Sequence, residues 1–162
     1  MIYDALTIEG RDRIIAAAGV RGSADTPLPE MEVLRKAFGD GRLRVLGEVT
    51  AQYAGLTLSD PKYDAYLALA EELDIPVALH TGMGPPGISY EPCCHGFRAN
   101  LGNPATVEEA LNRHPKLRLN LMHAGWPYLQ ETMAVLSTYP QVYADLGFYD
   151  WGSWYQGEIA GE

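Results

Sequence analysis

The chain has 162 residues, of which 47% are hydrophobic and 20% are charged, a composition typical of a globular domain with a sizeable core. Its 12 basic and 21 acidic residues give a net charge of −9 without a basic cluster, which argues against nucleic acid as a partner. No stretch approaches the ~18 apolar residues of a membrane span, and Met1–Arg13 lacks the pattern of a secretory signal, so we expect no membrane partner. The only cysteines, Cys93 and Cys94, are neighbours that cannot tie distant segments together, which favours a cytoplasmic location.

Short apolar runs that end near Gly or Pro predict strands buried on both faces of a sheet. In chain order these runs are Arg13–Val20, Arg42–Val49, Ile75–Thr81, Leu117–His123 and Val142–Leu146. Helical patterns with capping residues and prolines at their ends separate the runs, and they span Pro29–Phe38, Asp60–Leu73, Asn103–His114 and Pro127–Tyr139. The last pattern carries Leu129, Met133 and Leu136 on one stripe, as a helix that faces a core does.

The alternation of strands and helices predicts an α/β fold with parallel strands, either an open doubly wound sheet or part of a (βα)₈ TIM-type barrel. Neither G-x-G-x-x-G nor G-x-x-x-x-G-K is present after the first strand, so a nucleotide-binding open sheet has no support. A complete barrel needs at least ~200 residues, so a barrel in this chain would be partial. We expect the partial barrel in residues 1–150 and a divergent tail in residues 151–162.

Three polar residues stand where predicted strands end. Glu48, His80 and His123 each follow an apolar run and precede a Gly-containing loop. The carboxyl ends of parallel strands meet at one edge, where ligands gather, so these side chains are expected to converge. Imidazole nitrogens and a carboxylate are ligands of a catalytic zinc or a similar divalent ion. Either histidine alone is more often a hydrogen-bonded structural residue, but three such residues together favour a metal site.

The run that ends at His123 has an irregular pattern. Strict alternation would place His123 on the same face as Leu119 and Leu121 and would send Asn120 toward the helices. A bulge or a tilted strand is therefore expected near His123.

The segment Gly82–Gly102 is a long stretch without predicted helix or strand, and it is expected to lie over the strand ends. Its Arg98 is a candidate to bind a substrate carboxylate, although an arginine that faces solvent is the more frequent case. Trp126, near the end of the next strand, is a candidate to line an apolar substrate pocket. The contiguous residues Cys93, Cys94 and His95 lack the spacing of a zinc site and are a poor candidate. Asp145 is expected to cap the loop after the last strand.

Four stretches around these residues resemble the amidohydrolase-related family, the branch of metal-dependent hydrolases that includes aminocarboxymuconate-semialdehyde decarboxylase-like enzymes. They are Leu46–Leu56, Glu72–Gly87, Leu101–Pro127 and Tyr139–Gly147. The resemblance implies a (βα)₈ barrel that binds a divalent metal, usually zinc, at the strand ends. It further implies that His80 is a metal ligand, that His123 acts on a water or as a general acid/base, and that Glu48 lies near the metal.

The chain also departs from this family. It contains no H-x-H, which such enzymes carry on the first strand, and it lacks their Gly-Ser-Asp aspartate of the eighth strand. By this comparison the five strands are the third to the seventh of the barrel, and its first, second and last strands are missing. We therefore expect an internal fragment with impaired hydrolase or decarboxylase activity on small molecules. The alternatives are a non-catalytic barrel remnant that serves as a binding module and, with least support, an open-sheet binding protein of flavodoxin type. Open sheet edges also predict a homo-oligomer or pairing with another chain.

Overall fold

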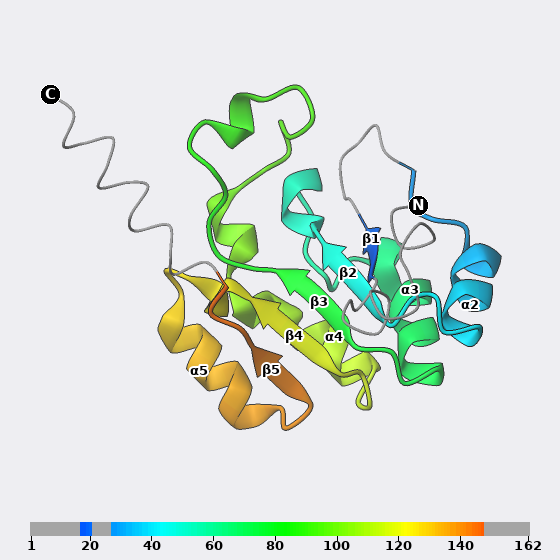
Figure 1. Cartoon of the computed structure of the whole chain (residues 1–162). Helices are drawn as coiled ribbons and strands as arrows, with labels where there is room; N and C mark the ends of the chain where they lie inside the picture. Colours follow the sequence, from blue (N-terminus) through cyan, green and yellow to red (C-terminus); the bar gives the residue numbers. More distant parts are fainter. Residues whose placement is uncertain (1–16, 21–26, 148–162) are drawn as a thin grey trace, which may run out of the picture.

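The computed structural model describes residues 17–20 and 27–147, and within them the chain forms one five-stranded sheet whose neighbouring strands are all parallel (Figure 1). The strands are β1 (Ala17–Val20), β2 (Val45–Val49), β3 (Val77–His80), β4 (Leu119–Met122) and β5 (Val142–Ala144). Residues 13–16 of the first predicted strand and the predicted tail, residues 151–162, lie outside the described residues.

The strands lie in sequence order, β1-β2-β3-β4-β5. A doubly wound sheet reverses its strand order at a switch point, whereas a barrel adds each new strand beside the last one. The observed order has no reversal, so the described residues form part of an α/β barrel. The prediction of a partial barrel is confirmed.

The α-helices lie between the strands and are α2 (Met31–Gly39), α3 (Pro61–Glu72), α4 (Glu108–Arg113) and α5 (Leu129–Thr138). Two predicted caps are present: the Asp60 side chain accepts the Lys62 N–H at 2.9 Å, and the Asn103 side chain accepts the Ala105 N–H at 2.9 Å. The helix predicted after Asn103 begins as the 3₁₀ helix η5 (Pro104–Val107) and becomes α-helical at Glu108. Among the described residues, no helix combines the length and the apolar character that crossing a membrane requires.

The core lies between the sheet and its helices. Alternate residues of the central strands are buried there, among them Val77, Leu79, Leu119 and Leu121, and they belong to one cluster with helix residues such as Leu67 and Leu111. On the other face, Ala78 of β3 is paired in register with Asn120 of β4, and β2 shifts its register against β3 between Leu46 and Val49. Glu48 and His80 lie at the carboxyl edge of this packed sheet.

Helix α5 turns its apolar stripe away from this core, contrary to the sequence pattern. Met133 is 67% exposed, and Leu129 and Leu136 are also exposed, whereas Thr132 and Val135 are buried. The Thr132 hydroxyl donates to the carbonyl oxygens of Ala124 (2.8 Å) and Tyr128 (2.9 Å). These bonds tie the polar residue, rather than the apolar stripe, to the loop that follows β4.

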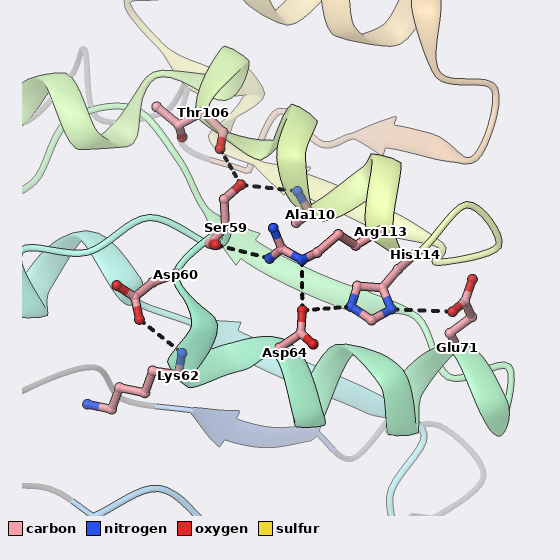
Figure 2. Close-up of polar contacts among 9 residues, drawn as sticks. All are labelled: Ser59, Asp60, Lys62, Asp64, Glu71, Thr106, Ala110, Arg113 and His114. Atoms are coloured by element: carbon pink, nitrogen blue, oxygen red, sulfur yellow. Dashed lines mark hydrogen bonds and ion pairs between the residues drawn. The ribbon is translucent and has the colours of Figure 1, made fainter.

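Helices α3 and α4 are joined by polar side chains (Figure 2). Asp64 accepts from Arg113 Nε at 2.8 Å, and the buried His114 ring lies between Asp64 (3.2 Å) and Glu71 (3.3 Å). Arg113, and then His114, hold the pKa of the Asp64 carboxyl below its usual range. At the other end of the helix pair, the Ser59 hydroxyl donates to the Thr106 carbonyl oxygen at 2.7 Å. These contacts fix how consecutive crossovers pack and, through them, how β3 and β4 are placed.

Candidate metal centre

Three adjacent strands deliver the candidate ligands to one edge of the sheet. Glu48 is the penultimate residue of β2, His80 is the last residue of β3, and His123 directly follows β4. Because β2 pairs with β3 and β3 with β4 in parallel, their carboxyl ends lie side by side. The structure therefore brings together the three residues that the sequence pattern singled out.

His123 reaches this edge by a change of backbone conformation rather than by strand alternation. Its φ is +63° and that of Ala124 is +47°, in the left-handed region that non-glycine residues rarely adopt. The leucines of β4 pack in the core against the helices, and Asn120 lies on the opposite face of the sheet. Strict alternation from His123 had predicted the reverse, with Asn120 facing the helices. The irregularity expected near His123 is present, as a left-handed turn immediately after the strand.

Asp145, just beyond β5, holds this turn in place. One of its oxygens accepts the backbone N–H of His123 at 3.1 Å and that of Gly147 at 3.0 Å, and the other accepts Asn120 Nδ2 at 2.7 Å. Burial alone would raise the pKa of the Asp145 carboxyl, but these hydrogen bonds outweigh it and lower the pKa. Asp145 therefore caps the following loop, as expected, and also fixes the backbone of a candidate catalytic residue.

The Glu48 carboxylate lies between the two imidazole rings. Its Oε1 is 2.8 Å from His80 Nδ1 and 3.6 Å from His123 Nε2, and the centroids of the two rings are 5.0 Å apart. One ligand atom from each residue lies within 4.8 Å of the others. Zinc–ligand bonds of about 2.0–2.2 Å place tetrahedral ligands roughly 3.4 Å apart, so the donor types and their spacing fit a divalent cation.

Hydrogen bonding also sets the charge of the site. Hydrogen bonds from His123 and His80 lower the pKa of Glu48 from its ordinary value of 4.5 to about 2, against the opposing effect of burial. His80 is 7% exposed, and its second nitrogen, Nε2, lies 3.3 Å from the Met83 carbonyl oxygen. When a cation binds at Nδ1, the ring proton lies on Nε2 and can donate to this carbonyl.

The lowered pKa of Glu48 makes stability depend on pH. Because the folded-state pKa lies below the unfolded one, Glu48 stabilises the fold above pH 4.5, and this contribution is lost as the pH falls toward 2. Solvent screens the carboxylate, which is 39% exposed, so we expect a contribution of about 1 kcal/mol rather than the full value of the shift. Urea denaturation of the metal-free proteins should give the wild type a higher free energy of unfolding than Glu48→Gln near pH 6, and a smaller difference near pH 3. Glu109→Gln, which removes an exposed carboxylate, is the matched control. A difference between wild type and Glu48→Gln that grows in acid would contradict the assignment.

An aromatic wall flanks His80, and the sequence pattern did not identify it. The Tyr53 ring contacts His80 edge-on at a centroid distance of 5.1 Å and Phe97 at 5.2 Å. Burial, together with the Glu48 charge, raises the pKa of the Tyr53 hydroxyl. The feature of the sequence that could have identified this wall is the position of Tyr53, in the loop directly after Glu48.

The other sequence candidates occupy less direct positions. Arg98 Nη1 donates to the carbonyl oxygens of His95 (3.0 Å) and Phe97 (2.6 Å), so its guanidinium supports its own loop. Trp126 is partly exposed, and its carbonyl oxygen accepts the Met83 N–H at 3.0 Å. The roles of Arg98 and Trp126 in substrate binding stay predictions.

The loop after β3 has more structure than the sequence indicated. It contains the 3₁₀ helices η3 (Ile88–Tyr90) and η4 (Ala99–Gly102), so the expectation of a stretch without regular structure was wrong. Cys93 and Cys94 are joined to each other by a disulfide. Their sulfur atoms are therefore not thiolate ligands in this structure. The sequence spacing had also made these residues a poor candidate for a zinc site.

Comparisons with known proteins agree with this geometry. A family model described as amidohydrolase matches residues 4–160. Protein fluG of Emericella nidulans is 32% identical over 72 residues, which cover 44% of this chain and 7% of that protein. The crystal structure of an uncharacterised TIM-barrel protein from Bordetella bronchiseptica matches with a TM-score of 0.55 at 22% identity, covering 74% of this chain and 40% of the other. The chain thus spans less than half the length of either protein, and the structural likeness supports the barrel fold alone.

Proposed function

Because this chain belongs to the amidohydrolase family, we propose that His80 and Glu48 contribute to a divalent metal centre, with zinc as the metal, and that His123 beside it transfers protons in reactions of small organic substrates. The observation that carries the proposal is the convergence of two imidazoles and one carboxylate, from three neighbouring strands, within 4.8 Å. Family members generally use divalent metals, and this donor set is one that zinc accepts.

Each residue has a distinct role in the proposed centre. His80 is buried and oriented by two hydrogen-bonding contacts, so it is the ligand whose position is best determined. Glu48 is ionised over the whole neutral range because its pKa is about 2, and it supplies negative charge to the cation. His123 is more accessible to solvent than His80, and its Nε2 faces Glu48, which suits a group that exchanges protons.

The proposed reaction depends on proton transfer by His123. A divalent cation bound at this centre supplies Lewis acidity that acidifies water and polarises a substrate carbonyl or carboxylate. The His123 ring accepts a proton from the attacking water and returns it to the leaving group, while the Glu48 carboxylate, 3.6 Å from Nε2, stabilises the positively charged ring. Hydrolysis of C–N or C–O bonds and non-oxidative decarboxylation can both use this arrangement, and we place hydrolysis first because of the family.

Substitution of His123 tests this function. We expect the zinc-loaded chain to hydrolyse small amides or lactones, or to decarboxylate carboxylated aromatics, and His123→Gln to lower kcat by roughly 10²–10⁴-fold with little change in zinc content. Elemental analysis of each variant and rates with and without a chelator are the measurements. A His123→Gln protein that keeps the wild-type rate would refute the role of His123. A zinc-loaded wild type that is inactive on all three substrate classes would favour the non-catalytic binding module.

The prediction that sheet edges pair with another chain stays a prediction. Tyr143 of β5 is 59% exposed and Leu146 just beyond it is 67% exposed, which supports pairing at this edge. Size-exclusion chromatography over a range of protein concentrations would test it, and a monomer at every concentration would contradict it.

A further inference from the structure

Gln52 is a buried polar residue that the proposed reaction does not use. It lies in the 3₁₀ helix η2 (Ala51–Ala54), which directly follows β2, and it is 2% exposed. Its side-chain Nε2 lies 3.0 Å from the Gly82 carbonyl oxygen, 3.1 Å from that of Arg98 and 3.4 Å from that of Ala99. One amide group therefore joins the loop after β2 to both ends of the long loop after β3.

The contact with Gly82 restrains a single peptide unit from two sides. The carbonyl oxygen of the Gly82–Met83 peptide accepts from Gln52, and the N–H of the same peptide donates to the Trp126 carbonyl oxygen at 3.0 Å. In addition, the Gly82 N–H donates to the Gly102 carbonyl oxygen at 2.8 Å, which closes the base of the loop. The loops after β2, β3 and β4 thus meet at one peptide unit.

This peptide unit leads directly to a candidate metal ligand. The next carbonyl, that of Met83, lies 3.3 Å from His80 Nε2, while His80 Nδ1 faces Glu48 at 2.8 Å. A ligand histidine depends on such an acceptor, because the hydrogen bond of one ring nitrogen sets both the orientation of the ring and the nitrogen that binds the metal. Any displacement of the Gly82–Met83 peptide would therefore displace the partner of His80.

We propose that Gln52 is a positioning residue for His80, acting through the Gly82–Met83 peptide and the Met83 carbonyl. This inference rests on the proposed metal centre for its functional meaning. Donation is the property that matters, because three carbonyl oxygens surround Nε2 whereas Oε1 is buried and has no hydrogen-bond partner among the described residues. A carboxylate at this position would present only acceptors to those carbonyls.

Three variants test the proposal. Gln52→Glu keeps the shape and loses the donors, Gln52→Met fills a similar volume without polar atoms, and Gln130→Glu makes the same change at an exposed site on α5. In the metal-free chain, NMR should show the same chemical shifts for the ring Cδ2–H and Cε1–H of His80 in the wild type and in Gln130→Glu. We expect both Gln52 variants to shift these ring signals and to exchange the Met83 amide at least ~10-fold faster, while β4 amides are unchanged.

Zinc titration provides the functional readout. We expect the Gln52 variants to bind zinc about 10–100-fold more weakly, the range found for residues that orient a metal ligand. Should Gln52→Glu fail to fold, Gln52→Met carries the test alone. Wild-type behaviour of the His80 ring signal in Gln52→Met would overturn the proposal. If no variant and no wild-type sample binds zinc, the metal centre fails, and the ring signal still decides whether Gln52 positions His80.

Discussion

We expect His80→Ala to weaken zinc binding by more than ~100-fold, beyond the loss typical of residues that only orient a ligand. His80 is the most buried of the three candidate ligands, and contacts with Glu48 and Met83 hold its ring in one orientation. Without the imidazole, Glu48 and His123 are the only two residues left of the three-residue cluster in the described part of the chain. Isothermal titration with zinc, supported by elemental analysis after dialysis, measures the effect.

His95→Ala is the matched control for this experiment. His95 is exposed in the loop after β3, and its ring Nδ1 lies 3.3 Å from the Ser89 carbonyl oxygen. We expect His95→Ala to bind zinc as the wild type does. Urea denaturation of both variants in chelator separates loss of a ligand from loss of the fold. Equal zinc affinity in His80→Ala and the wild type would refute the proposed centre.

The location of the site could be predicted because parallel strands constrain it strongly. In such a sheet a polar residue at the end of an apolar run has one edge to occupy, so the positions of Glu48 and His80 in the sequence already implied their proximity. The strand order and the N-caps at Asp60 and Asn103 were predictable for a similar reason, since each depends on residues close together in the chain.

The features that the sequence did not reveal depend on contacts between distant segments. The left-handed turn at His123 is held by Asp145, which lies 22 residues away. The orientation of α5 depends on hydrogen bonds from Thr132 to the loop after β4, and a hydrophobic stripe alone gave the wrong face. Gln52 acts on peptides 30 to 47 residues away, and no local pattern marks a glutamine for such a role.

Gly82→Ala should destabilise the fold by about 2–5 kcal/mol, the sum of a left-handed backbone penalty and the overpacking of an added methyl group. The φ of Gly82 is +83°, and a Cβ at this position would collide with the Trp126 carbonyl oxygen. This oxygen is a backbone atom that also accepts the Met83 N–H, so it cannot move without disturbing the peptide that Gln52 holds. Urea denaturation gives the free energy of unfolding, and zinc titration of the folded fraction should show weakened binding.

Gly87→Ala separates the two contributions to this loss. Gly87 has a similar φ of +79°, but apart from its chain neighbours no atom of the described residues lies within 4 Å of an added Cβ, so this variant incurs the backbone penalty of roughly 1–2 kcal/mol alone. Both substitutions restrict the unfolded chain equally, and that effect cancels in the comparison. The excess cost of Gly82→Ala therefore measures the close approach of the loops after β3 and β4. Equal costs at the two glycines would mean that these loops separate easily, and the peptide unit could not then hold the partner of His80 in place.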